Sequence, residues 1–163
     1  VNGKAYVGNS EATNAWYVYD PTLNSWNTCA NFPGPQRNFS SIFSLNNKIY
    51  LGTGITFNYT TMYNDLWCYD PQLNTWSAKA NFPASVRYCT QGFSVNGKGY
   101  IGLGYSSATT NNFDEIYEYD DVTNSWTQAP SFLGSALPSH PSKAQRFIWL
   151  ISFVWLIWFI WFI

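Results

Sequence analysis

Charged residues are scarce in this chain. Only 10% of its 163 residues are Asp, Glu, Lys or Arg, and its formal net charge is −1. A typical soluble domain contains about 25% charged residues. The few lysines and arginines form no cluster, and proteins that bind nucleic acids rely on such clusters to neutralise phosphates. The composition therefore argues against a nucleic acid as a partner.

Residues that hold metals or redox centres are equally few. The chain has one histidine, His140, and three cysteines with no Cys-x-x-Cys pair. A copper centre needs several imidazole or soft ligands, and a Ser-His-Asp arrangement needs a suitably placed histidine. The one acidic cluster, at 114–121, is expected to be a solvated edge, because a calcium site needs about six converging oxygens. We expect no catalytic residue, no metal and no cofactor.

Aromatic residues, in contrast, make up 20% of the chain and recur at a fixed interval. Trp26 returns as Trp76 and Trp126, and Arg37 returns as Arg87, each 50 residues later. The same interval separates the Tyr-Asp-Pro motifs at 19–21 and 69–71, the related Tyr-Asp-Asp at 119–121, and the Asn-Phe-Pro motifs at 31–33 and 81–83. A fixed period of this length indicates a repeat architecture.

Each repeat is predicted to contain four short strands. The segments 40–45 and 90–95 alternate in the manner of strands. The second of them is followed by Asn96-Gly97, the strongest short hairpin signal, because both central residues of such a turn need positive φ. The remaining strands are expected at 48–52, at 66–69 and, after an Asp-Pro turn, around Trp76. Large aromatic residues at repeated positions are expected to fill the contacts between neighbouring sheets.

This order of features resembles the kelch repeat over residues 1–132. The resemblance implies an all-β fold, a partial kelch-type β-propeller of about three four-stranded antiparallel blades at about 1–33, 38–83 and 88–132. Kelch units usually carry a Gly-Gly pair where this chain has Gly52-Thr53-Gly54. That variant is similar to secreted bacterial kelch proteins of the galactose-oxidase-like propeller group, which implies an extracellular or cell-envelope location.

Three blades are too few to close a ring, since propellers usually have about four to eight. The segment 1–4 matches 95–98, so the first unit begins inside a hairpin. The simplest expectation is that the sequence is part of a longer protein. A ring made from two chains is the alternative.

The repeat stops after Phe132. A Pro/Ser-rich linker at 133–146 leads to a tail at 147–163, which is apolar except for one Ser. The tail is marginal in length for spanning a bilayer, and its pattern repeats every three residues. This period favours a low-complexity or out-of-frame end over a membrane anchor or a buried segment. Membrane contact through 147–163 is kept as an alternative.

Function is expected in the segments that differ between repeats, because variable loops on a rigid scaffold usually carry it. The variable loops run over 9–15, 53–65 and 103–114, and the crossovers between blades over 32–39 and 82–89. In a meander these segments emerge on the same face. We predict a non-catalytic recognition module of a larger kelch propeller protein, which binds a protein or a glycan through these loops. The alternative is the scaffold part of a carbohydrate-acting propeller enzyme.

The candidate ligand-binding residues combine aromatic plates, amides and two arginines. Aromatic plates beside amides suit a sugar ring or a polar peptide, and the arginines would clamp a carboxylate. In the alternative interpretation each arginine bonds crossover carbonyls of the adjacent blade. The candidates are Arg37, Phe57, Asn58, Tyr59, Tyr63, Arg87, Tyr105, Asn112 and Phe113.

Overall fold

The computed structural model describes residues 1–10 and 13–130, and every regular element in these ranges is a β-strand. The predicted all-β class is therefore confirmed. Among the described residues there is no helix long and apolar enough to cross a membrane. The predicted linker at 133–146 and tail at 147–163 lie outside the described residues.

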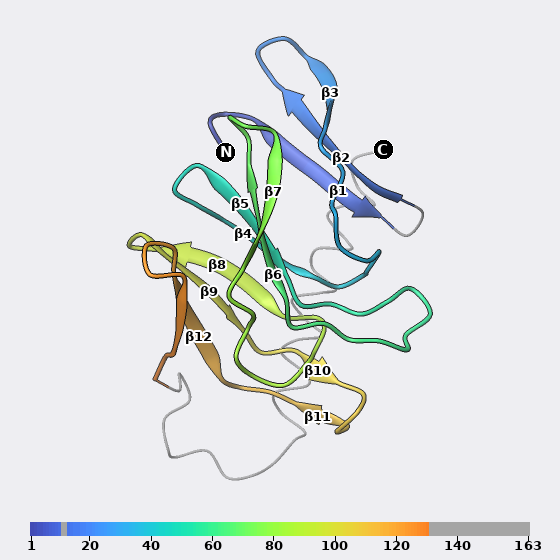
Figure 1. Cartoon of the computed structure of the whole chain (residues 1–163), viewed down its shortest axis with the longest axis vertical. Helices are drawn as coiled ribbons and strands as arrows, with labels where there is room; N and C mark the ends of the chain where they lie inside the picture. The colour runs from blue at the N-terminus through green and yellow to red at the C-terminus, as the bar shows by residue number, and fades with distance from the viewer. Residues whose placement is uncertain (11–12, 131–163) are drawn as a thin grey trace, which may run out of the picture. The chain divides into compact units, whose positions relative to one another are not determined.

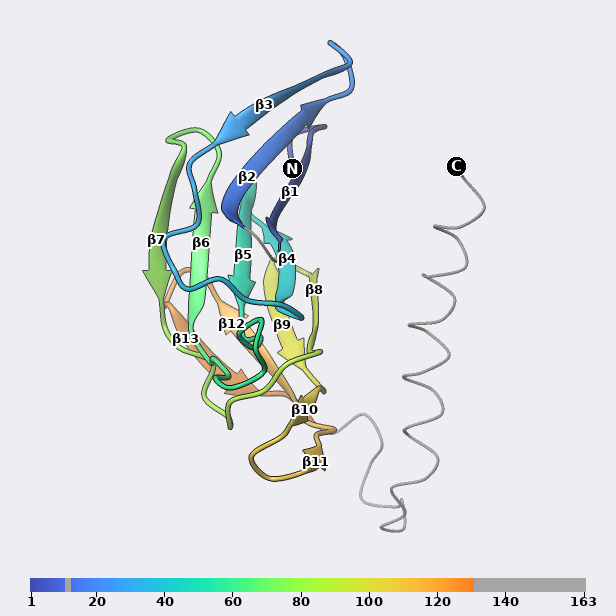
Figure 2. The same cartoon turned by 90° about the vertical axis from the view of Figure 1, so that its right-hand side faces the viewer.

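Three antiparallel meander sheets follow one another along the chain (Figure 1). The first contains β1 (Ala5–Ser10), β2 (Thr13–Asp20) and β3 (Ser25–Cys29). The second contains β4 (Ser41–Leu45), β5 (Lys48–Gly52), β6 (Leu66–Asp70) and β7 (Thr75–Lys79). The third contains β8 (Gln91–Val95), β9 (Lys98–Gly102), β12 (Ile116–Asp120) and β13 (Ser125–Gln128). A small hairpin of β10 (Tyr105–Ser106) and β11 (Asn111–Asn112) projects from the loop between β9 and β12 (Figure 2).

The turns within each sheet follow from local chemistry. Asn46 and Asn47 between β4 and β5 both have positive φ, as do Asn96 and Gly97 between β8 and β9. In the turn after β12, the Asp120 carboxylate accepts a hydrogen bond from the Val122 backbone N–H at 2.8 Å. The equivalent bonds of Asp20 and Asp70 are 2.9 Å long. These repeated aspartates are turn formers.

The same aspartates should make the free energy of unfolding depend on pH in the acidic range. Lys98 lies 2.7 Å from Asp120, and its hydrogen bond to the carboxylate holds the pKa of Asp120 below the usual range. A lowered pKa in the folded state stabilises the protein above about pH 4 and loses this contribution as the pH falls through the folded pKa. We expect unfolding free energy measured by urea titration to fall less steeply below about pH 4 in Asp120→Asn than in wild type. Parallel curves for the two proteins would contradict this.

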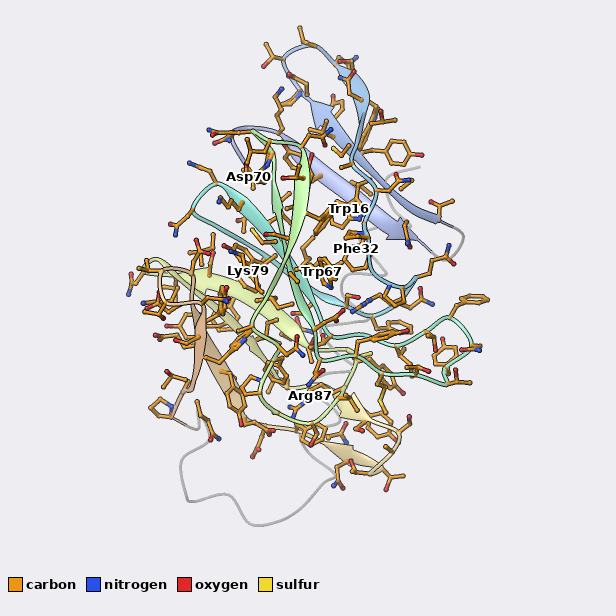
Figure 3. All side chains as sticks on the ribbon, in the orientation of Figure 1. Trp16, Phe32, Trp67, Asp70, Lys79 and Arg87 are labelled. Atoms are coloured by element: carbon orange, nitrogen blue, oxygen red, sulfur yellow. The ribbon has the colours of Figure 1, made fainter. Side chains whose placement is uncertain are left out.

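Aromatic residues fill the two contacts between consecutive sheets, which we call seams. Trp16 of the first sheet meets Trp76 of the second edge-on, with ring centroids 5.0 Å apart. Figure 3 shows Trp16, Phe32 and Trp67 gathered in this first seam. In the second seam, Phe43 lies so close to β9 that a Cβ on Gly99 would come within 2.2 Å of its ring. The repeated aromatic positions therefore build the core, as expected.

Two hydrogen bonds recur in both seams. In the first, the Ala30 N–H donates to the Asn74 side-chain oxygen at 2.7 Å, and the Trp76 indole N–H donates to the Ala30 carbonyl at 3.0 Å. The second seam repeats both bonds, at 2.9 Å each, with Ala80, Asn124 and Trp126. The two seams thus share these hydrogen bonds, but only the second also packs strand against strand, with β4 lying against β8 and β9.

Candidate functional site

The loops after β5 and β9 lie against the crossovers that enter β4 and β8, and together they form one surface. Two backbone hydrogen bonds join Asn38 to Ile55, at 2.8 and 3.0 Å, and two join Tyr88 to Tyr105, at 3.0 and 2.9 Å. The Cys89 N–H donates to the Phe39 carbonyl at 3.0 Å, which links the two crossovers. We call this surface the loop face, comprising residues 35–40, 53–65, 85–90 and 103–115. The expectation that these segments share a face is confirmed.

Arg37 lies inside this face with its side chain 0% exposed. Its guanidinium forms a two-point ion pair with Asp65, with one of the two distances 2.8 Å. It also donates to the carbonyls of Pro35 at 3.2 Å and Thr53 at 3.1 Å. The ring of Tyr63 stacks over it, with the guanidinium carbon 4.0 Å from the centroid.

Arg87 repeats this arrangement 50 residues later. Its guanidinium donates to Glu115 at 2.7 Å and to the Leu103 carbonyl at 3.3 Å, and its Nε donates to the Ser85 carbonyl at 2.9 Å. The Phe113 ring centroid lies 3.6 Å from the guanidinium carbon. Figure 3 places Arg87 toward the opposite end of the sheets from Asp70, the last residue of β6 before the turn to β7.

These contacts bear on four candidate residues: Arg37, Tyr63, Arg87 and Phe113. Each arginine holds a carboxylate of the chain itself and lies under an aromatic ring, so both are part of the scaffold that fixes the loops. The alternative interpretation, in which each arginine bonds backbone carbonyls, matches this geometry. The carbonyls that accept these bonds belong to the arginine's own repeat and not to the adjacent blade. Clamping of a ligand carboxylate stays a prediction, and the buried geometry does not favour it.

Four aromatic side chains form a row across the loop face. The Phe39 ring lies 6.3 Å from that of Tyr59 and 6.0 Å from that of Tyr88, measured between centroids. The rings of Tyr88 and Tyr105 meet edge-on, with their centroids 5.6 Å apart. Phe39 and Tyr59 are about half exposed, whereas Tyr88 and Tyr105 are partly covered. Burial raises the pKa of Tyr88 further above its ordinary value. We call these four residues the aromatic row.

The tip of the 53–65 loop is held by its own hydrogen bonds. The Thr56 N–H donates to the Thr61 carbonyl at 2.8 Å, and the Thr61 N–H donates to the Thr56 hydroxyl at 2.9 Å. Asn58 accepts a hydrogen bond from the Thr60 hydroxyl at 2.7 Å. Tyr59 has a φ of 59°, an uncommon conformation for an aromatic residue. These hydrogen bonds and the positive φ together set the backbone conformation in which the loop presents Tyr59.

The remaining candidates lie at the edges of this surface. Phe57 and Asn58 are exposed at the loop tip. Asn112 is exposed on β11, opposite Tyr105 in the hairpin register. The structure thus brings Tyr59 and Tyr105 into one row and keeps Phe57, Asn58 and Asn112 around it.

Sequence reasoning missed Phe39 and Tyr88, the two central members of the row. Both lie in the predicted crossovers, where only the arginines were singled out. The sequence did contain a signal for them, because neither aromatic residue recurs in the repeat. Cys89 stands 50 residues after Phe39, and Asn38 stands 50 residues before Tyr88. Aromatic residues that break a repeat are free of the scaffold's packing requirement.

Charge is distributed unevenly between the loop face and the turns. Each lysine and arginine within 1–10 and 13–130 forms an ion pair: Lys4–Asp20, Arg37–Asp65, Lys48–Asp70, Lys79–Asp121, Arg87–Glu115 and Lys98–Asp120. Only two of these pairs belong to the loop face, and both of their arginines are buried. Asp114 is the one other charged residue of that face. The cations of the loop face are therefore buried and paired, and its one remaining charge is the exposed Asp114 carboxylate.

The acidic residues at 114–121 are engaged separately. Glu115 pairs with Arg87, and Glu118 accepts a hydrogen bond from Tyr100 at 2.6 Å. Asp121 accepts one from Tyr50 at 2.5 Å across the second seam. Within the described ranges, no three His, Cys, Asp or Glu side chains gather as a metal site would require.

A groove of about 460 Å³ lies between the first and second sheets beside β1. Its lining residues are Tyr6, Val7, Gly8, Trp16, Arg37, Asn38, Phe39, Ser40, Ile42 and Leu51. The groove borders the aromatic row at Phe39, and it lies where the first sheet has three strands and the other sheets have four. Its lining mixes apolar side chains with the polar residues Arg37, Asn38 and Ser40.

Comparison with known proteins supports the fold. No protein-family model matches the chain, and no curated protein is significantly similar to it in sequence. Among solved structures 153 chains match, one of them described as the structure of YjhT, with a TM-score of 0.71 and 20% identity. The match covers 80% of this chain and 49% of that chain, so the chain spans about half the length of this neighbour. The successive antiparallel sheets thus have a propeller-like arrangement.

Proposed function

We propose that the chain is a non-catalytic recognition module of a larger kelch-type propeller, and that it binds an uncharged glycan or polar protein segment through its loop face. The 50-residue period and the meander sheets support the kelch assignment. An extracellular or cell-envelope setting goes with this proposal. The observation that carries it is the aromatic row, which lies on a surface whose only cations, Arg37 and Arg87, are buried and paired.

The row suits a flat ligand with one apolar and one polar side. Aromatic rings bind the apolar face of such a ligand, and the Asn58 side chain, exposed at the loop tip beside Tyr59, can donate its amide N–H groups to the polar edge. An anionic ligand would leave its own charge unmatched, because Arg37 and Arg87 are already paired with carboxylates of the chain. We therefore favour a neutral glycan, with a protein ligand as the second arm of the test.

The expected result of truncating the row is loss of binding without loss of folding. Phe39→Ala with Tyr59→Ala should weaken binding at least about 10-fold, since each exposed ring contact contributes about 1 kcal/mol. Binding would be measured on arrays of neutral and acidic glycans and of peptides. Tyr59→Phe keeps the ring and should bind nearly as well as wild type.

The matched control is Leu73→Ala, which removes an exposed apolar side chain from the turn between β6 and β7. It should leave binding unchanged. Equal loss in the control and the double variant, or preferential binding of acidic glycans by wild type, would overturn the proposal.

A further inference from the structure

Two segments of the chain match the pattern Asn-x-Ser/Thr with a middle residue other than proline. One is Asn38-Phe39-Ser40, in the crossover before β4, and the other is Asn58-Tyr59-Thr60, in the loop between β5 and β6. This pattern is the acceptor sequon for N-linked glycosylation, a modification of surface loops in secreted proteins. Three residues also match by chance, so the local structure decides which asparagine is available.

Asn58 lies at the exposed tip of its loop. All residues at 57–61 are exposed, and the hydrogen bonds between Thr56 and Thr61 close the tip outside the ladder of the second sheet. Within the described ranges of the chain, no acceptor takes a hydrogen bond from the Asn58 side-chain nitrogen. The nitrogen that would carry a glycan is therefore both exposed and uncommitted.

The two groups that define the sequon are in direct contact at this tip. The Thr60 hydroxyl donates to the Asn58 side-chain oxygen at 2.7 Å, and the Thr60 N–H donates to the same oxygen at 3.4 Å. A glycosyl-transferring enzyme has to recognise the hydroxyl together with the amide, because the hydroxyl distinguishes the sequon from other asparagines. The turn thus presents amide and hydroxyl side by side, where one enzyme site can take both.

The other sequon is committed to the scaffold. The Asn38 N–H and carbonyl both bond to Ile55, at 2.8 and 3.0 Å. The Ser40 hydroxyl donates to the Thr53 carbonyl at 3.4 Å, and a Cβ on Gly54 would come within 2.6 Å of it. Moving this segment into an enzyme would break the contact between the crossover and the loop. The fold therefore favours Asn58 over Asn38 as an acceptor.

We propose that Asn58 is the acceptor of an N-linked glycan, which an oligosaccharyltransferase takes from a polyprenyl-diphosphate oligosaccharide. The Asn58 Nδ2 attacks the anomeric carbon of the first sugar and forms an N–C bond. The C–O bond to the diphosphate breaks, its electron pair leaves with the polyprenyl diphosphate, and one Nδ2 proton passes to a base of the transferase. The inference rests on the proposed extracellular or cell-envelope setting, because this modification belongs to secreted proteins, and not on ligand binding.

The neighbouring side chains suit an attached sugar. Phe57 is 54% exposed and Tyr59 is 57% exposed, so an aromatic ring stands on each side of Asn58 in the sequence. Such rings pack against the apolar face of a sugar. Because Tyr59 also belongs to the aromatic row, an attached glycan would compete with an external ligand for its ring. The modified chain should therefore bind the ligand proposed above more weakly than the unmodified chain.

The test incubates the purified, folded full chain with a single-subunit oligosaccharyltransferase and a polyprenyl-diphosphate oligosaccharide. Mass spectrometry of the intact chain should show one added glycan. Peptide N-glycosidase converts a glycosylated asparagine into aspartate, so sequencing of the digested product should place the change at position 58. Asn58→Gln should abolish the transfer, whereas Asn38→Gln, the matched control, should leave it unchanged.

Variants of Thr60 separate recognition of the sequon from simple exposure. Thr60→Ala keeps Asn58 exposed but removes the hydroxyl, and it should lower transfer at least about 100-fold. Thr60→Ser keeps a hydroxyl and should retain transfer. Unstructured peptides covering 34–42 and 54–62 should both accept the glycan, since each contains its complete sequon. Transfer to both peptides but to only one site of the folded chain would show that the fold selects Asn58.

Three results would overturn the proposal. Absence of transfer to the folded chain would show that the loop tip does not reach the enzyme. Transfer to Asn38 as fast as to Asn58 in the folded chain would show that the fold does not select between them. Equal transfer to Thr60→Ala and wild type would exclude recognition of the sequon. The proposed ligand binding is measured separately on the unmodified chain, so either proposal can fail without the other.

Discussion

Replacing Arg37 with Met is expected to lower the free energy of unfolding by about 3 kcal/mol. The substitution keeps the apolar stem and removes the buried guanidinium. Asp65 then loses both of its charged hydrogen bonds and retains one from the Trp67 indole at 2.9 Å. The Thr53 carbonyl loses the guanidinium donor as well and keeps only the longer hydrogen bond from the Ser40 hydroxyl, at 3.4 Å. Removing one partner of a buried pair costs more than the pair contributes, because the other charge is left uncompensated.

Lys48→Met provides the matched control. Lys48 forms an ion pair with Asp70 at 3.2 Å, but its side chain is partly exposed, and pairs of this kind contribute less than about 1 kcal/mol. Both variants would be compared with wild type by urea denaturation. Equal destabilisation by the two substitutions would show that Arg37 is not part of the scaffold, and would return it to the list of ligand-binding residues.

Gly102→Ala is expected to destabilise the third sheet by about 2–3 kcal/mol. A Cβ at this position would lie 2.6 Å from the Glu115 carbonyl oxygen and 2.7 Å from the Ile116 Cα. Ile116 pairs with Gly102 in the sheet, and the Glu115 carbonyl accepts a hydrogen bond from the Leu103 N–H at 3.0 Å, so neither atom can move aside as a flexible side chain would. The strain would also displace the start of the 103–115 loop and with it Tyr105.

Gly97→Ala separates this steric effect from the loss of backbone freedom. Gly97 has a φ of +73° in the hairpin between β8 and β9, and a Cβ there meets nothing within 4 Å. Its cost should be about 1 kcal/mol, from the positive φ alone. The measurement is again the unfolding free energy, and a larger loss in Gly97→Ala than in Gly102→Ala would refute the steric argument.

Neighbouring residues of the loop face have two different expected roles, one in stability and one in binding. Tyr63 and Phe113 cover the arginines and fix the loops, whereas Tyr59 and Phe39 remain available to a ligand. Substitutions in the first pair should therefore reduce stability, and substitutions in the second should reduce binding. Binding and stability should therefore change independently of each other in the two sets of variants.

The sequence by itself determined the strands, the turns and their order. Asn96-Gly97 and the Asp-initiated turns depend on the φ preferences and short side chains of neighbouring residues, so they can be read locally. The 50-residue recurrence of Trp26 and its equivalents predicted packed, equivalent sheets, because a repeat can bury its aromatic face only against a copy of itself. It also indicated which segments vary and emerge on one face.

Only the tertiary structure decided which side chains on that face are available. Arg37 pairs with Asp65, which is 28 residues away, and this contact exists only when the loop folds back over the crossover. Phe39 and Tyr88 become neighbours because two crossovers 50 residues apart lie side by side. The repeat likewise made Trp26 and Trp76 indistinguishable, but exposure depends on the neighbouring sheet, and only one of the two has such a neighbour in this chain.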